Sequence, residues 1–363
     1  MRFSSRVRLL CIGLGVAISS ALAYGQVGQL GPIHVDPQES KEMVRFSLRP
    51  SGSVPLSPEA AKILRDLTFA NGVDVQSAAP WHVEIAYDEF DEDGDNVHSG
   101  AIEEFYVNPK KFRKVIKTDE FAQTEVADGT DLYRAGDQSW PSQSTLQAVE
   151  EVLSPLNGAT IAGDGSPNKL AWTVGKTKLD CVVLRDNRVL SDNGLPKFCY
   201  EPGTTILRYT RGQGWDETVY NNVFQFDQRY VAHEVEVTHS GKPFLKISLA
   251  RIEALSQLDS LLFVPPAGSP GPLTGVVTVP SAILMKKYLV HRGFPHFPRG
   301  IHGKVAVKFT VNKEGRVVRA QATDGPEELR KPVEEDVMKF EFRPFLILDK
   351  PVEVESTTSY MIQ

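Results

Sequence analysis

The segment WHVEIAYDEF, Trp81–Phe90, decides the expected fold, because apolar and polar residues alternate along it. A period of two is typical of a β-strand that buries one face. The pattern returns in segments 101–108, 112–118, 121–127 and 131–135. The connections have turn-forming compositions such as DEDGDN and DGT, so the sequence predicts antiparallel strands joined by hairpins.

The strand series continues through much of the chain, and two amphipathic helices interrupt it. The first helix is expected to have Ser57 as its cap and Pro58 in its first turn, and the second is expected to begin at Ser144. This arrangement predicts one large, mainly antiparallel half-barrel over residues 51–264, with the helices covering one face. Further strand-like segments are 170–174, 178–184, 206–210, 217–224, 230–238 and 244–252.

Length and charge limit the possible classes of function. The chain has 363 residues, a formal net charge of −6 and a pI near 5.8. The length exceeds that of a usual single domain, so two domains are expected. The basic excess that phosphate contacts demand is missing, so we expect no nucleic-acid partner.

The first residues have the layout of a secretory signal peptide. Arg2, Arg6 and Arg8 precede an uncharged run at 9–23, which ends in small residues. We expect cleavage after residue 23, a periplasmic location, and a poorly ordered lead-in at 24–50. The alternative is an uncleaved inner-membrane anchor. The run is shorter than the roughly 20 apolar residues that span a bilayer, which argues against this alternative.

Two cysteines remain after the expected signal, Cys181 and Cys199. In an oxidising compartment an even pair usually forms a bridge, so we expect a disulfide between them. A loop of this length predicts a stabilisation of roughly 3 kcal/mol. The alternative is a pair of buried free thiols.

Motifs for metal, cofactor or catalytic chemistry do not emerge from the sequence. The acidic turn at Asp91 lacks the Gly and Glu that a calcium loop needs at its sixth and twelfth places, where Asn96 and Ile102 stand. The histidines at 291–302 have no zinc spacing. We therefore expect no cofactor, no metal and no enzyme, while a hydrolase among the Asp, Glu and His residues stays open as an alternative.

The last part of the chain predicts a separate small domain. Segment 265–275, PPAGSPGPLTG, is a short, stiff linker. Beyond it, GKVAVKFTV at Gly303–Val311 alternates, a turn ends at Gly315, and a return strand, a helix and a long final strand follow. The order strand, strand, helix, strand predicts an α+β domain over residues 276–363.

This tail resembles the C-terminal domain of TonB, the energy transducer of Gram-negative bacteria, over residues of about 290–363. Two positions depart from the family: Phe294 stands where members commonly have Gln, and Phe340 stands where Trp is usual. The loss of Gln weakens the expectation that this motif recognises a partner. The residues that carry the resemblance are Pro295, Phe297, Pro298, Gly303, Gly315, Phe340, Phe342 and Pro344.

The TonB resemblance implies that a short peptide of an outer-membrane transporter, or of another envelope protein, adds as a strand to the sheet edge. The final strand is the implied edge, and it lacks the Lys or Pro that usually protects an edge. The alternative is a final strand that receives no partner. The implied docking residues are Val354, Glu355, Ser356, Thr357, Thr358, Ser359, Tyr360, Met361 and Ile362.

The front of the chain, over residues of about 64–152, resembles the periplasmic lipoprotein carriers of the LolA type. The shared pattern is a hairpin, then Gly100-x-Ile102, then an aromatic residue before PKKFR at 109–113. The resemblance implies a half-open barrel, closed by helices, that holds a lipid or another apolar ligand. A filled core without a ligand is the equal alternative.

Together these expectations describe a secreted periplasmic binding protein whose TonB-like module docks a partner peptide, with a link to TonB-dependent transport. Two alternatives remain: a membrane-anchored energy transducer of the TonB type, and a periplasmic carrier of a lipid or other apolar ligand.

Overall fold

The computed structural model describes residues 30–33, 58–73, 79–156, 166–185, 196–212, 216–293 and 300–362. The predicted signal segment 1–23, most of the lead-in 24–50 and the expected cap Ser57 lie outside these residues, as do Pro295, Phe297 and Pro298. Within them, no helix combines the length and the apolar character needed to cross a membrane.

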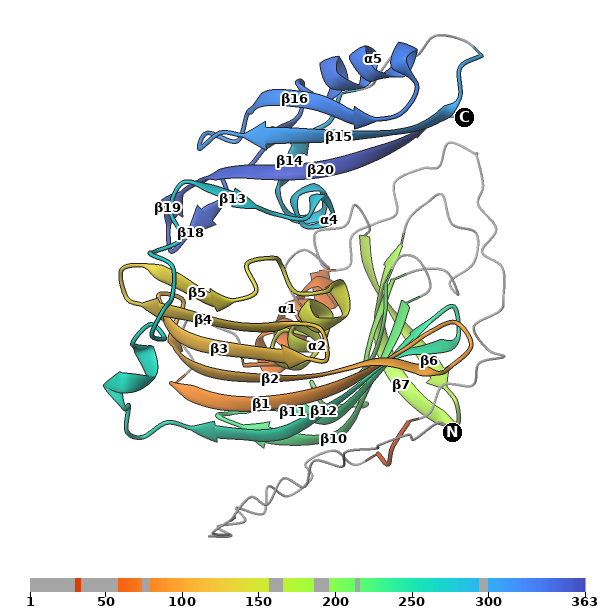
Figure 1. Ribbon diagram of the computed structural model, residues 1–363. Helices are drawn as coiled ribbons and strands as arrows, with labels where there is room; N and C mark the ends of the chain where they lie inside the picture. The colour runs from red at the N-terminus through yellow and green to blue at the C-terminus, as the bar shows by residue number, and fades with distance from the viewer. Residues whose placement is uncertain are drawn as a thin grey trace, which may run out of the picture.

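The predicted large sheet is confirmed as a twelve-stranded, entirely antiparallel sheet of the described residues. Its order is β5-β4-β3-β2-β1-β12-β11-β10-β9-β8-β7-β6, so two series of hairpins meet where β1 pairs with β12. Figure 1 shows the strong curvature of this sheet. The strands are β1 Trp81–Phe90, β2 Asn96–Asn108, β3 Lys111–Thr118, β4 Ala122–Asp128, β5 Leu132–Gly136, β6 Ser166–Val174, β7 Thr177–Arg185, β8 Lys197–Tyr200, β9 Leu207–Arg211, β10 Asp216–Phe226, β11 Arg229–His239 and β12 Lys242–Ala254.

Two helices, α1 (Pro58–Ala70) and α2 (Gln143–Leu153), lie on the concave side of the sheet (Figure 1). Each helix carries an apolar stripe, and both stripes pack into the main core against side chains of β1 and β7–β12. Trp81, 1% exposed, stacks on Tyr106 at a ring distance of 4.9 Å. The prediction of helices covering one face of a half-barrel is therefore confirmed.

Two local predictions were wrong. The side chain of Ser142, not Ser144, caps α2 by accepting a hydrogen bond from Thr145 N at 3.2 Å. Ser144 is buried inside the helix and donates to Glu89 at 2.6 Å. The strand β8 was missed, because all four of its residues are buried and it therefore lacks a period of two.

The opposite face of the sheet carries a smaller apolar cluster of Ile33, Val174, Leu179, Cys181, Cys199, Tyr209 and Val219. The predicted disulfide is confirmed here: Cys181 and Cys199 lie directly opposite each other on β7 and β8 and are bonded. Ile33, only 1% exposed, reaches this cluster from a segment far away in the sequence. The described residues 30–33 therefore cover the outer face of β8–β10.

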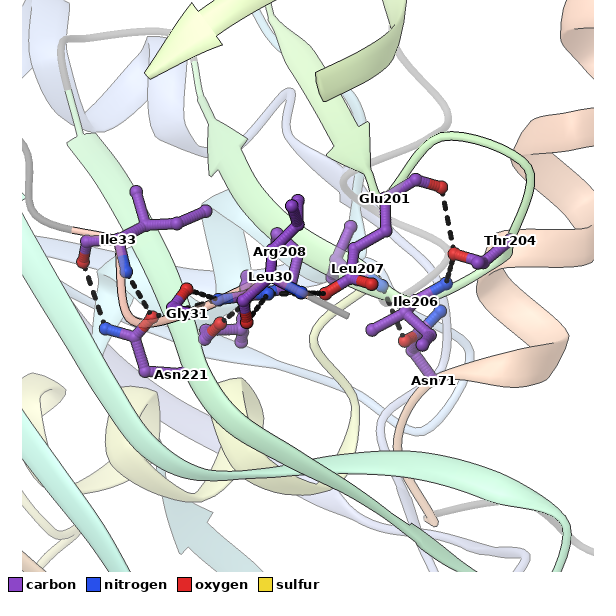
Figure 2. A network of polar contacts seen from close by, with 11 residues as sticks. Leu30, Gly31, Ile33, Asn71, Glu201, Thr204, Ile206, Leu207, Arg208 and Asn221 are labelled. Carbon is purple, nitrogen blue, oxygen red and sulfur yellow. Dashed lines mark hydrogen bonds and ion pairs between the residues drawn. The ribbon is translucent and has the colours of Figure 1, made fainter. Parts of the chain in front are cut away.

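Backbone-directed hydrogen bonds fasten residues 30–33 to the sheet (Figure 2). Asn221 of β10 accepts from the N–H of Ile33 at 2.9 Å and donates to its carbonyl oxygen at 3.0 Å. Arg208 of β9 donates to the carbonyl oxygens of Leu30 and Gly31 at 3.1 and 2.8 Å. The side chains of β9 and β10 thus replace the neighbouring strand that an extended segment would normally need.

The Arg208 guanidinium uses all five of its donors. Besides the two carbonyl oxygens of the segment, it donates to Glu201 Oε1 at 2.5 Å, to Tyr220 O at 2.9 Å and to Asn221 Oδ1 at 3.3 Å. Both charged side chains of the Arg208–Glu201 pair are 2% exposed. Full hydrogen bonding of this kind is what a buried ion pair requires.

A second sheet follows the segment 265–275, with the order β13-β20-β15-β16 and with α5 packed on β15 and β16. The predicted strand, strand, helix, strand order is present, and its core includes Val307, Phe309, Val333 and Phe340. The elements are η3 Ser260–Phe263, β13 Val276–Thr278, α4 Ser281–Ile283, η4 Leu284–Tyr288, β14 Leu289–His291, β15 Gly303–Val311, β16 Val317–Asp324, α5 Glu327–Val337, β17 Glu341–Phe342, β18 Leu346–Ile347, β19 Lys350–Pro351 and β20 Glu353–Ile362.

Several contacts join the second sheet to the β5 end of the first. The indole N–H of Trp140 donates to Thr278 O at 2.5 Å, and its ring meets Phe345 edge-on at 6.3 Å. Lys350 Nζ lies 2.8 Å from both Thr130 O and Asp131 Oδ1. Both ring packing and polar contacts therefore join the two sheets.

Candidate functional site

Helix α2 positions the most unusual titratable group of the large sheet. Three interactions fix the start of this helix: the Ser142 cap, the Ser144–Glu89 hydrogen bond and a hydrogen bond between Tyr87 and Thr145. Ala148 and Val152 then hold its middle and end against the core. The helix is therefore anchored along its length, and side chains on its other face have defined positions.

Glu151, near the end of α2, points toward β10. Its Oε2 accepts from Tyr220 O–H at 2.6 Å, and its Oε1 accepts from Thr218 Oγ1 at 3.3 Å. Burial raises the pKa of Glu151 to about 7, although its hydrogen bonds with Tyr220 and Gln147 act in the opposite direction. Burial also raises the pKa of Tyr220 well above its usual value, and the charge of Glu151 adds to that rise. The folded protein therefore keeps a proton on Glu151 where an ordinary glutamate is ionised.

Glu151 borders an open cavity of about 900 Å³ at the rim of the half-barrel. The cavity lies where α2 meets the ends of β1 and β11 and the starts of β10 and β12. The lining combines apolar rings with many polar groups. The residues are Phe90, Asp91, Glu92, Gln143, Gln147, Glu150, Glu151, Pro155, Asp216, His239, Ser240, Lys242, Pro243 and Phe244.

The charges around this rim cavity are mostly negative. Five carboxyl groups line it, against two basic side chains, His239 and Lys242. Both basic groups already have partners: His239 Nδ1 lies 2.5 Å from Asp216 Oδ1, and Lys242 Nζ donates to Glu92 O at 2.8 Å. The cavity therefore offers a better electrostatic environment to a cation than to an anion.

A second, much smaller space lies nearer the middle of the concave face. Between α2, β10 and β11 the described residues border a void of about 10 Å³, with a lining that includes Asn71, Leu207, Tyr220 and Val231. This is about the space of one water molecule. Of these two spaces between described residues, the one at the rim is large enough for a ligand.

The predicted docking edge is partly covered by the chain itself. β13 pairs in parallel with Glu353, Val354 and Glu355, the N–H of Val279 donates to Glu355 O at 2.9 Å, and Ser356 Oγ donates to Val279 O at 2.7 Å. On its other side β20 pairs with β15 from Val354 to Ile362. Along residues 357–362 no described strand pairs with the predicted edge, although α4 contacts β20.

The residues of the predicted TonB-like motif occupy structural positions. Phe340 and Phe342 are buried in the second core, while Pro344 is exposed. Gly303 opens β15. Gly315 has a φ of 85°, and a Cβ there would lie 2.0 Å from Phe342 O, so the turn requires glycine. These positions do not gather around one cavity.

Glu151 and its surroundings were not predicted from the sequence. The partners of the carboxylate, Thr218 and Tyr220, are 67 and 69 residues away and meet it only when β10 packs under α2. A glutamate on an amphipathic helix carries no local signal of burial. Only the apolar spacing of α2 hinted that this helix faces the sheet.

The sequence matches no family model and no curated protein. Among solved structures, the chain is similar to an outer membrane lipoprotein-sorting protein domain from Vibrio parahaemolyticus, with a TM-score of 0.35 and 10% identity over 56% of this chain and 94% of that chain. A LolA superfamily protein from Nitrosomonas europaea gives 0.34 and 12%, over 56% and 97% of the two chains. A DUF1329 family protein from Desulfovibrio piger gives 0.34 and 10%, over 57% and 96%.

Two of these three structures have names of the lipoprotein-sorting type, which is the type that residues 64–152 resemble, and none of the three is described as a TonB domain. Their TM-scores are too low to carry a conclusion about function.

Proposed function

We propose that this protein binds an amphiphile, a molecule with an apolar chain and a cationic head group, in the rim cavity beside α2. The observation that carries the proposal is Glu151, a carboxyl group with a raised pKa at the border of a cavity large enough for such a ligand. Perturbed carboxyl groups in cavities are typical of functional sites. The proposal follows the carrier alternative and places the ligand at the rim.

The lining supports both parts of this ligand. Phe90, Pro155, Pro243 and Phe244 supply apolar surface for a chain, and Glu151 supplies a carboxyl group for a cationic head group. The neighbouring Glu150 lies 3.6 Å from Lys287 Nζ, so part of its charge is already balanced. A volume of about 900 Å³ lies within the usual range of small-molecule sites, roughly 300–1,000 Å³. The attraction of a bound cation would offset the cost of burying an ionised Glu151.

The test is calorimetric titration of the full chain with decyltrimethylammonium and, as the opposite charge, decyl sulfate, both below micelle formation. We expect one site for the cation and at least about tenfold weaker binding of the anion, which corresponds to about 1.4 kcal/mol. Affinity for the cation should rise as the pH increases through about 7, because Glu151 then becomes negative. Equal binding of both detergents, or of neither, would contradict the proposal.

Four variants, one of them a matched control, locate the site. Glu151→Gln should weaken cation binding about tenfold and flatten its pH dependence, because the negative charge that attracts the head group is lost. Gln147→Trp should block the cavity. Glu328→Gln, on the exposed side of α5, is the matched control and should change nothing. Histidine also changes charge near neutral pH. If Glu151 is the source of the pH dependence of binding, that dependence must persist in His239→Asn.

A second candidate function is strand docking at β20, and one observation favours it: the chain already adds its own segment, β13, to this edge. Glu355 O faces β13, and backbone groups of a strand alternate in direction, so Thr357, Ser359 and Met361 direct their N–H and C=O groups to the same open side. We propose that an extended peptide of an envelope protein continues the pairing along residues 357–362.

Proline at Thr357 or Ser359 should remove an outward N–H without breaking the pairing with β15, and peptide binding to the full chain should fall below detection. Thr358→Pro is the contrasting change, because its N–H faces β15 and the sheet itself should weaken. Fluorescence titration with transporter-derived peptides measures binding, and circular dichroism checks the fold. Binding that survives both edge prolines would exclude this mode of docking.

A further inference from the structure

A histidine and three glutamates meet on the outer face of the large sheet, away from α1 and α2. His82 and Glu84 lie on β1, Glu103 on β2 and Glu253 on β12. The alternation along β1 buries Trp81 and Val83 in the core and directs His82 and Glu84 outward. The His82 ring is nevertheless buried, with 6% of its side chain exposed, because it stacks on Phe105 at 4.0 Å.

Both nitrogens of the His82 ring face carboxylate oxygens. Nδ1 lies 3.1 Å from Glu253 Oε1, while Nε2 lies 3.0 Å from Glu103 Oε1 and 3.7 Å from Glu84 Oε1. The ligand atoms of His82, Glu84 and Glu103 are all within 4.8 Å of one another. Glu253 therefore orients the ring at Nδ1, and Nε2 faces the carboxylates of Glu84 and Glu103.

The carboxylate pair is electrostatically unfavourable as it stands. Glu84 and Glu103 are direct cross-strand partners, a position where like charges destabilise a sheet. In the described part of the chain, Arg251 pairs with this cluster: its Nε lies 3.5 Å from Glu84 Oε1 and its Nη1 lies 3.7 Å from Glu253 Oε1. Three glutamates share this arginine and the His82 ring, so negative charge remains for another cation.

We propose that His82 Nε2, Glu84 and Glu103 bind a divalent transition-metal ion, with Zn²⁺ as the expected ion. Zinc bonds of about 2.1 Å place tetrahedral ligand atoms roughly 3.4 Å apart, which lies between the two distances from Nε2 to the carboxylates. Imidazole nitrogen with carboxylate oxygen is a donor set that zinc accepts. Solvent completes the coordination, because both glutamate side chains are about 40% exposed.

Glu253 has a different role in this site. Histidines that bind a metal usually donate their other N–H to a carboxylate, which fixes the ring and its tautomer. Glu253 stands at that position on Nδ1 and is a positioning residue. These residues show no zinc spacing along the chain because they come from three strands, and only the register of β2, β1 and β12 brings them together.

The test is titration of the full chain with Zn²⁺ after treatment with EDTA, followed by calorimetry, and with Co²⁺, followed by its visible absorption. We expect one site of this kind, with a Co²⁺ spectrum of low coordination number. Glu84→Gln and Glu103→Gln should each abolish the Co²⁺ signal, and Glu253→Gln should weaken affinity about tenfold. Glu84 and Glu103 are half-buried and Glu253 is exposed, and none of the three belongs to the apolar core, whereas replacement of buried His82 risks the fold.

Two further variants separate a metal site from a network of ion pairs. Glu234→Gln, an exposed glutamate on β11, is the matched control and should keep the signal. Arg251→Gln removes the competing cation and should raise the affinity for Zn²⁺, while a pure ion-pair network would only lose stability. The proposal is overturned if no Zn²⁺ binds. It is also overturned if binding is unchanged in Glu84→Gln and Glu103→Gln, because the ion would then be bound by other histidines.

Discussion

Arg208→Met is expected to lower the free energy of unfolding by about 3–5 kcal/mol, the usual cost of removing one partner from a buried ion pair. The change takes away the guanidinium next to Glu201 and five hydrogen bonds, two of which hold residues 30–33. Urea unfolding measures the loss. Hydrogen exchange of the Ile33 amide should accelerate as well, because its bond to Asn221 depends on the same network.

Two controls interpret that result. Arg319→Met removes an exposed arginine of β16 and should change stability by less than about 0.5 kcal/mol. The double variant Glu201→Gln with Arg208→Met should be more stable than Arg208→Met alone, because the buried charge is then absent from both partners. If Arg208→Met unfolds like the wild type, the pair is not a stabilising element.

Replacing both Cys181 and Cys199 with alanine should lower the free energy of unfolding by about 3 kcal/mol, because the unfolded chain regains the freedom of the closed loop. The bond joins directly opposed residues of β7 and β8, both fully buried, so it also supports the outer cluster under Ile33. Urea unfolding with and without a reducing agent is the measurement.

The reduced wild type is the matched control for this variant. It should lose a similar amount of stability, while the reducing agent should not affect the alanine variant. Equal stability of the oxidised and reduced wild type would mean that the pairing of β7 with β8 alone holds this edge.

The sequence predicts this fold best where one face of a strand is exposed to solvent. β1 was predicted with its correct ends because apolar and polar residues alternate along it up to the acidic turn. β8 failed because its residues are buried on both faces, by the main core and by the outer cluster. The three-residue β13 is too short to show a period, so the sequence did not reveal that the chain covers part of its own docking edge.

Sites are harder to predict here than strands, because they depend on register. Glu151 becomes unusual only through Tyr220, and His82 only through carboxylates on two neighbouring strands. Neither set has a fixed spacing along the chain. The disulfide was predictable because composition alone, two cysteines in the expected mature chain, left a single pairing.

The meeting of β1 with β12 sets an order of events during folding. Of the described strands in the large sheet, every neighbouring pair except this one joins strands that follow each other in the sequence. The two hairpin series can therefore form early and locally, whereas the β1–β12 ladder closes the longest loop and forms slowly. During synthesis, β1, which begins at Trp81, has one unpaired edge until β12 has been made. Aggregation of the nascent chain would begin at this edge.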